Sequence, residues 1–122
     1  MDRICFALPI LPGKTEDARA FQRELNGPRK SDYAASEQRI GITREYWFLQ
    51  QSPQGAMFLA YMESPDFASA LGQFASSQDA FDQWFKQRLV DVTGVDLNSP
   101  PPGPLSELLS SYEAPAQRAG AS

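Results

Sequence analysis

Apolar and polar residues alternate along the chain with two different periods, which predict strands and helices in turn. Residues 3–11 (RICFALPIL) form a short apolar run that ends before a Pro-Gly pair, a pattern typical of a strand. Residues 15–25 then place apolar side chains at helical spacing and predict a helix. A second helical segment, residues 29–39, follows Pro28 and is closed by Gly41.

Residues 42–51 and 56–63 predict two further strands joined by a tight turn. The connecting segment SPQG has Pro at its second position and Gly at its fourth, the composition of a type I turn, so the two strands form a hairpin. A turn centred on its Pro and Gln sets the register of the two faces: Trp47 with Ala60, Leu49 with Phe58 and Glu45 with Met62 on one, and Phe48 with Leu59, Tyr46 with Tyr61 and Arg44 with Glu63 on the other. A slip by one residue would exchange these faces.

The second half of the chain predicts two more helices and a less regular end. Two helical patterns, separated by residues 77–79, run as far as Gly94. Residues 96–104 (DLNSPPPGP) predict an extended strap, because proline fixes φ and lacks the amide donor. Residues 105–113 fit either a final edge strand or a helix, and residues 114–122 predict a mobile tail.

These elements predict a single α+β domain over residues 1–113, with an antiparallel sheet and helices on one of its faces. If residues 105–113 form a strand, the order is the β-α-β-β-α-β ferredoxin-like pattern. The uncovered face of such a sheet is normally polar, yet residues 56–62 (AMFLAYM) are apolar at both parities. An apolar face of this extent needs a cover, so we expect a homodimer in which two copies pack sheet to sheet.

Two segments carry a resemblance to a known group of proteins. The opening LPILPGKTEDARAF and the hairpin REYWFLQQSPQGAMFLAYME, together with the strand order, resemble the dimeric α+β barrel superfamily, and in particular an uncharacterised bacterial branch of it. The resemblance covers residues 3–95 and implies two ferredoxin-like sheets packed face to face. The superfamily includes cofactor-free monooxygenases, polyketide cyclases, isomerases, haem enzymes and proteins without known activity, so it implies the fold and leaves the function open.

Composition excludes several classes of function. The net charge of −4 argues against a nucleic-acid partner, which requires clustered Lys and Arg to neutralise phosphates. The chain has no His, which removes Ser-His-Asp and Cys-His catalysis and His-ligated zinc or haem, and it departs there from the haem-binding members of the superfamily. A single cysteine, Cys5, gives no disulfide framework. No apolar run approaches the length of a membrane span, so we expect a cytoplasmic protein with no membrane partner.

Two patterns that suggest nucleotide or metal binding do not complete their motifs. Residues 13–15 (GKT) follow a strand and open a helix, as in a P-loop, but the position that requires the first glycine is Leu8. Two prolines in the same loop also remove amides that would cradle phosphate. The four aspartates between residues 79 and 96 do not have the spacing of a calcium-binding loop. We therefore expect no nucleotide site, no metal and no cofactor.

Five residues are candidates for a ligand site: Arg44, Tyr46, Tyr61, Glu63 and Trp84. Small-molecule pockets combine apolar walls with a few polar groups, and the face of the hairpin with two phenols has that mixture under the aromatic residues 81–85. A flat, aromatic or carboxylate-bearing ligand would pair its acid with Arg44. Tyr46 or Glu63 would then be the acid–base group, because no His can serve.

A filled core also explains this face, and core aromatic residues are the commoner case. Tyr46 and Tyr61 would then form a cross-strand aromatic pair, ending in an ion pair between Arg44 and Glu63. Two hypotheses stand at this point. The chain is an enzyme or binder for a small, partly aromatic metabolite, or it is a non-enzymatic dimeric structural module. In both, Trp47 on the opposite face is a candidate dimer-core residue, and the pattern does not decide which face of the sheet meets the partner.

Overall fold

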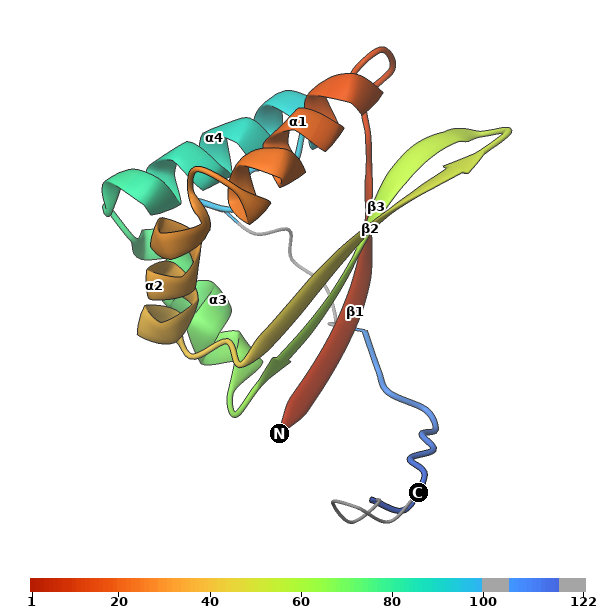
Figure 1. Ribbon diagram of the computed structural model, residues 1–122, viewed down its shortest axis with the longest axis vertical. Coiled ribbons are helices and arrows are strands. Elements are labelled where there is room, and N and C mark those ends of the chain that lie inside the picture. The colour runs from red at the N-terminus through yellow and green to blue at the C-terminus, as the bar shows by residue number, and fades with distance from the viewer. Residues whose placement is uncertain (100–105, 117–122) are drawn as a thin grey trace.

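A three-stranded antiparallel sheet carries four helices on one of its faces (Figure 1). The computed structural model describes residues 1–99 and 106–116. The elements follow in the order β1 (Asp2–Pro9), α1 (Thr15–Asn26), α2 (Lys30–Ile40), β2 (Arg44–Ser52), β3 (Gly55–Ser64), α3 (Phe67–Ser76) and α4 (Ala80–Thr93). The α+β class, the antiparallel sheet and every helix and strand predicted up to Gly94 are confirmed.

The sheet has the order β1-β3-β2, with β3 in the centre and both of its neighbours antiparallel to it. The predicted hairpin register is confirmed: Trp47 lies opposite Ala60, Tyr46 opposite Tyr61 and Arg44 opposite Glu63. Gly55 closes the turn at a φ of 126°, which a side-chain-bearing residue would adopt only with strain.

The helices cover the face of the hairpin that the sequence had assigned to the dimer. The side chain of Trp47 points toward the helices, where its ring contacts Phe58 and Phe85. The rings of Tyr46 and Phe48 point the other way and are 51% and 56% exposed. The placement of the two phenols beneath the α4 aromatics was therefore wrong, as was the placement of Trp47 in the dimer core. Both faces are apolar, and the right-handed crossover from β1 through the helices to β2 decides which face the helices cover.

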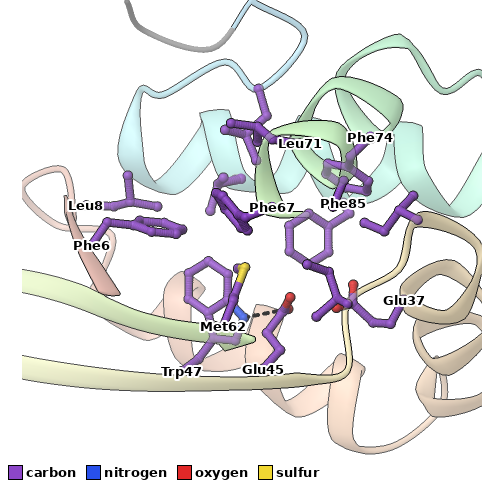
Figure 2. A pocket seen from close by; sticks show the side chains of 15 residues that line it. Phe6, Leu8, Glu37, Glu45, Trp47, Met62, Phe67, Leu71, Phe74 and Phe85 are labelled. Carbon is purple, nitrogen blue, oxygen red and sulfur yellow. Dashed lines mark hydrogen bonds between the residues drawn. The ribbon is translucent and has the colours of Figure 1, made fainter. Parts of the chain in front are cut away.

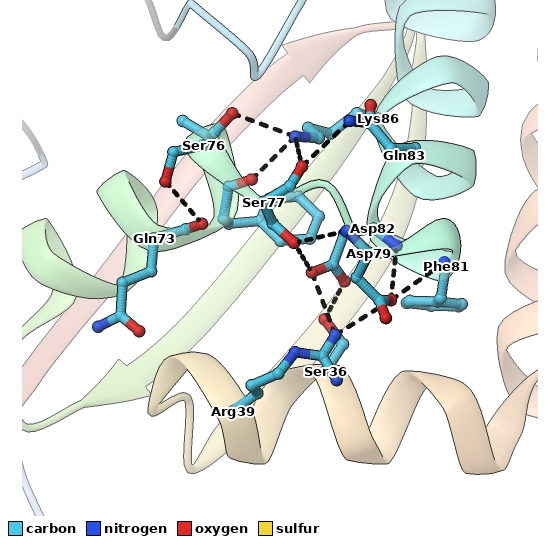
Figure 3. Close-up of polar contacts among 12 residues, drawn as sticks. Ser36, Arg39, Gln73, Ser76, Ser77, Asp79, Phe81, Asp82, Gln83 and Lys86 are labelled. Carbon is cyan, nitrogen blue, oxygen red and sulfur yellow. Dashed lines mark hydrogen bonds and ion pairs between the residues drawn. The ribbon is translucent and has the colours of Figure 1, made fainter.

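A buried carboxylate joins the helices to one another (Figure 3). Asp82, near the start of α4, is fully buried and accepts hydrogen bonds from the hydroxyl groups of Ser36 on α2 and Ser77 in the α3–α4 connection. The guanidinium of Arg39 on α2 lies 3.1 Å from the same carboxylate. A buried charge is tolerated when it is paired and hydrogen-bonded in this way, and these contacts fix α2 against α4.

A buried ammonium group closes the end of α3. Lys86 of α4 is 1% exposed, and its Nζ donates hydrogen bonds of 2.9 to 3.1 Å to the carbonyls of Phe74, Ala75 and Ser77 (Figure 3). The last carbonyls of a helix have no partner within the helix, and they carry the negative end of its dipole. Lys86 donates hydrogen bonds to these carbonyls from the neighbouring helix α4, and its positive charge lies at the negative end of the α3 dipole.

The segment predicted as a final strand or helix is neither within residues 106–116, every one of which is exposed. It is attached to the edge of β1 by a hydrogen bond from the amide of Cys5 to the hydroxyl of Ser106, at 3.0 Å, and by an ion pair between Arg3 and Glu113. Its sequence contains no β-branched residue to favour a strand. Much of the predicted strap, residues 100–104, and of the tail, residues 117–122, lies outside the described residues.

Candidate functional site

A small apolar cavity lies between the sheet and the helices, with a volume of about 50 Å³ (Figure 2). Its wall is built from all three strands and from α2, α3 and α4, and includes Phe6, Leu8, Trp47, Met62, Phe74 and Phe85. Two acids, Glu37 and Glu45, are its polar residues, and no Lys or Arg lines it. The cavity therefore combines an apolar wall with one acidic corner.

Glu45 enters the cavity from β2. Alternation along the strand sends its side chain to the same face as Trp47, and the indole Nε1 of Trp47 donates a hydrogen bond of 2.8 Å to its Oε2 (Figure 2). The hydroxyl of Tyr33 on α2 donates to the same oxygen. Two donors from two different elements thus hold the Glu45 carboxylate in place as an acceptor.

Glu37 faces Glu45 from the side of α2. It stands four residues after Tyr33, so both side chains share one face of the helix. Its Oε2 is buried without a donor, and two ionised carboxylates have no proton to share. Burial, the charge of Glu45, a hydrogen bond to Glu45 and the charge of Asp82 raise the pKa of Glu37 to about 10. Glu37 is therefore a protonated acid at neutral pH, and it donates toward Glu45.

The corner holds an acid and a base side by side. Burial and the adjacent Glu45 raise the pKa of the Tyr33 hydroxyl well above its usual range, so it also remains a proton donor. Two neighbouring carboxyl groups, one of them held protonated by burial, are the arrangement that general acid–base chemistry uses. Groups with such shifted pKa values are concentrated at functional sites.

A groove at the free edge of β2 adjoins this corner. It has a volume of about 230 Å³ and lies between the free edge of β2 and the end of α1, where Gln22, Asn26 and Phe48 line it. Glu45 and Trp47 line both the groove and the cavity. Glu45 and Trp47 therefore border both spaces.

Four of the five candidate residues predicted from the sequence lie together, but on the open face of the sheet. The rings of Tyr46 and Tyr61 are stacked with centroids 6.2 Å apart, and the Tyr61 hydroxyl donates a 2.7 Å hydrogen bond to Glu63. Arg44 lies 4.0 Å from Glu63 with its side chain 64% exposed. None of these four residues lines the cavity beneath the helices.

The fifth candidate, Trp84, lies on the other side of the sheet from these four. Its ring packs edge-on against Phe21, and the guanidinium of Arg29 lies 4.0 Å above the ring centroid. This contact joins α4 to the connection between α1 and α2. The predicted five-residue constellation is therefore divided between two faces.

The sequence analysis did not identify the residues of the acidic corner. Two signals could have found them. Tyr33 and Glu37 share the side of α2 that also carries Ile40, and Glu45 alternates with Trp47 and Leu49 on one face of β2. An acid at an inward position on each of two facing elements is the pattern that was missed.

Two further properties concern the described residues only. Within residues 1–99 and 106–116, no group of three or more Cys, Asp or Glu side chains could hold a metal ion. No helix in that part of the chain is long and apolar enough to cross a membrane.

Comparisons with known proteins agree with the architecture. The structure is similar to that of tetracenomycin F2 cyclase from Streptomyces glaucescens, a type-II polyketide cyclase, with a TM-score of 0.57, 20% identity, and coverage of 94% of this chain and 100% of that chain. It is also similar to L-rhamnose mutarotase from Formosa agariphila, with a TM-score of 0.59, 15% identity, and coverage of 92% and 100%. At these identities the likeness concerns the fold alone, a ferredoxin-like α+β arrangement with helices on one face of an antiparallel sheet.

The search of curated proteins found no match. A family does match, however, over residues 1–98, which include the whole sheet, all four helices and the acidic corner. The chain belongs to this family, the family of unknown function DUF6176.

Proposed function

We propose that this protein binds a small, partly aromatic metabolite at the cavity beneath the helices and transfers a proton on it, with Glu37 as the acid and Glu45 as the base. The carrying observation is the pair of facing carboxyl groups, one of which burial keeps protonated. Tyr33 and Trp47 hold the second carboxyl group by hydrogen bonds. The wall of the cavity is apolar and partly aromatic, as small-molecule sites are, and neither residue needs a metal or a His for this chemistry.

The comparisons support a small-molecule role. The two similar structures are, by their names, a polyketide cyclase and a sugar mutarotase. Both names describe conversion of a small organic molecule on this fold, although a fold by itself does not transfer a function. The proposal for this chain rests on its own acidic corner.

The same proposal includes a cytoplasmic homodimer formed through the open face of the sheet. Tyr46 and Phe48 are more than half exposed there, and the helices cover only the opposite face. Exposed aromatic residues on one face of a sheet are costly in water and favour a cover. A second copy presents the same surface and closes both sheets by two-fold symmetry.

The alternative is a non-enzymatic dimeric module. The observation that favours it is the size of the cavity, about 50 Å³, which is well below the roughly 150 Å³ that holds a benzene ring. In this alternative the acidic corner is a structural contact between α2 and β2, and the groove beside it stays empty.

Native mass spectrometry after incubation with a mixture of small aromatic metabolites distinguishes the two functions. We expect a retained compound on the wild-type protein and on the control variant Glu107→Gln, whose residue lies in the exposed segment far from the corner. In D₂O, the wild type should exchange a carbon-bound proton of the retained compound, and Glu45→Gln should not. Failure to retain any compound would favour the structural module.

A further inference from the structure

Besides the cavity and the groove, a hollow of about 310 Å³ lies between α1 and the free edge of β2. We propose that this hollow binds a small aromatic carboxylate, with the ring on its apolar floor and the acid group at Arg23. The sequence suggested a ligand of this class with Arg44 as its partner, but Arg44 lies on the open face of the sheet and is paired with Glu63. The hollow is separate from the proposed proton-transfer site, because neither Glu37 nor Glu45 lines it.

The floor of the hollow belongs to the hydrophobic core. Ala18 of α1 and Phe58 of β3 are buried there, and Leu49 of β2 packs against the same core. Apolar side chains from three elements therefore form a surface on which an aromatic ring is removed from water. A cavity of roughly 150 Å³ holds a benzene ring, so a hollow of about 310 Å³ has room for one ring and a short acid chain.

The polar side of the hollow comes from one face of α1. Its residues are spaced three, four and seven positions apart, which aligns them along the helix: Arg19, Gln22, Arg23 and Asn26. Two of them are cations, two are amides, and no Asp or Glu lines the hollow. In a chain with a net charge of −4, the hollow is thus a local positive site, which attracts an anion.

Arg23 has no ion-pair partner within the described residues. The three acids of α1 are each paired with other cations: Glu16 with Arg19, Asp17 with Lys14, and Glu24 with Arg29 and Arg88. A planar guanidinium binds a carboxylate through two parallel N–H···O bonds. A carboxylate on a ligand is therefore complementary to the cation that the acids of α1 leave unpaired.

Gln22, next to Arg23 in the helix, supplies a donor that lacks an acceptor. Its Nε2 is buried and makes no hydrogen bond within the described residues, which is unfavourable for a buried polar group. A rotation of the terminal amide would bring this nitrogen to the hollow that the side chain lines. A carboxylate has more acceptor positions than the two N–H groups of one arginine occupy, so a bound acid would serve both residues.

Three probes separate the contribution of the ring from that of the charge: phenylacetate, phenylacetamide and acetate, titrated against the full chain by ligand-observed NMR at neutral pH and low salt. Phenylacetamide keeps the ring without the charge, and acetate keeps the charge without the ring. We expect phenylacetate to bind at least roughly tenfold more tightly than either, a difference of about 1.4 kcal/mol. Equal binding of phenylacetamide or acetate would overturn the ligand class, and no binding of phenylacetate would overturn the site.

Arg23→Gln tests the partner of the acid group at an exposed residue whose loss breaks no ion pair of the described chain. We expect this variant to bind phenylacetate at least roughly tenfold more weakly and phenylacetamide as the wild type does. Lys30→Gln removes the same charge at an exposed position outside the hollow, and it should bind phenylacetate like the wild type. Wild-type affinity in Arg23→Gln, or equal weakening in both variants, would overturn the role of Arg23.

The position of the probe has its own measurement. In ¹⁵N-resolved spectra of the wild type, phenylacetate should shift the side-chain amide of Gln22 and the indole N–H of Trp47, since both residues line the hollow. Shifts confined to other parts of the chain would overturn the site. Such a failure would leave the proposed function in place, because the exchange of a carbon-bound proton tests Glu45 independently.

Discussion

The carboxylate of Glu45 accepts a 2.8 Å hydrogen bond from the indole Nε1 of Trp47, two residues further along the same strand. The indole ring itself is held edge-on against Phe58, with centroids 5.2 Å apart at an angle of 79°. The direction of the N–H group is therefore set by the packing of the core. The packing of the Trp47 ring therefore also fixes the orientation of the Glu45 carboxylate.

This relationship predicts that Trp47→Phe destabilises the protein without changing its fold. Phe fills less of the space beside Phe58 and removes one donor to a charged group. We expect the free energy of unfolding to fall by about 2 to 4 kcal/mol, from the lost hydrogen bond and the reduced burial together. Urea unfolding followed by circular dichroism measures this change.

Tyr46→Phe is the matched control, because it removes a polar group from the adjacent residue on the open face. We expect its effect on the free energy of unfolding to stay within about 0.5 kcal/mol. If Trp47→Phe were as mild as this control, the Trp47 hydrogen bond would not position Glu45.

Glu37 predicts a specific dependence of stability on pH. The pKa of Glu37 is about 10 in the folded protein, compared with an ordinary value of 4.5. Between these two pH values the folded state therefore holds a proton that the unfolded chain has already released. The stability that this proton contributes is complete below pH 4.5, decreases as the pH rises, and is lost at about pH 10. The slope is on the order of 1 kcal/mol per pH unit at most.

Glu37→Gln should remove this slope, since the amide is uncharged at every pH. We expect the wild type to lose stability in urea unfolding between about pH 5 and 9, and the variant to be less sensitive to pH and the more stable of the two at the upper end. Glu107→Gln should retain the wild-type slope. Parallel curves for the wild type and Glu37→Gln would show that Glu37 is ionised in the folded protein.

Lys86 predicts a local effect at the end of α3. Lys86→Met keeps the length of the side chain but leaves the carbonyls of Phe74, Ala75 and Ser77 without their donor. Unsatisfied buried carbonyls cost about 1 to 3 kcal/mol. We expect that loss in urea unfolding, together with faster amide hydrogen exchange in the last turn of α3. Lys30→Met, at an exposed position, should change neither. Uniform exchange across all helices in Lys86→Met would contradict a local role.

In the hairpin, the pairing of residues could be predicted from the sequence, but the face that the helices cover could not. The Pro and Gly of the turn fix its position, and the period of two then fixes which residues share a face, so the pairing of Tyr46 with Tyr61 was predictable. The side that the helices cover was not, because Trp47 and Phe48 are equally suited to burial. That choice depends on the handedness of the crossover between β1 and β2, which the apolar pattern does not contain.

The acidic corner formed by Glu37 and Glu45 could not be predicted from the sequence for a different reason. In a helical pattern a residue such as Glu37 reads as a solvated position, because acids are rarely buried without a partner. Its burial depends on Tyr33 in its own helix and on Glu45 in a strand that comes later in the chain. Only the packing of α2 against β2 brings these groups together, and the raised pKa of Glu37 is a result of that packing.

The open face of the sheet predicts the assembly of the protein. Phe48 is 56% exposed at the middle of β2, opposite Leu59, and in a sheet-to-sheet dimer its ring would be covered by the partner. Phe48→Glu removes about 2 kcal/mol of burial per copy and applies twice in a symmetric pair, which weakens the dimer by roughly a thousandfold. Analytical ultracentrifugation at micromolar concentration should therefore show a dimeric wild type and a monomeric variant with unchanged circular dichroism. Gln38→Glu, with the same added charge on the exposed side of α2, should remain dimeric. A wild type that sediments as a single chain, or a dimeric Phe48→Glu variant, would mean that something other than a second copy covers this face.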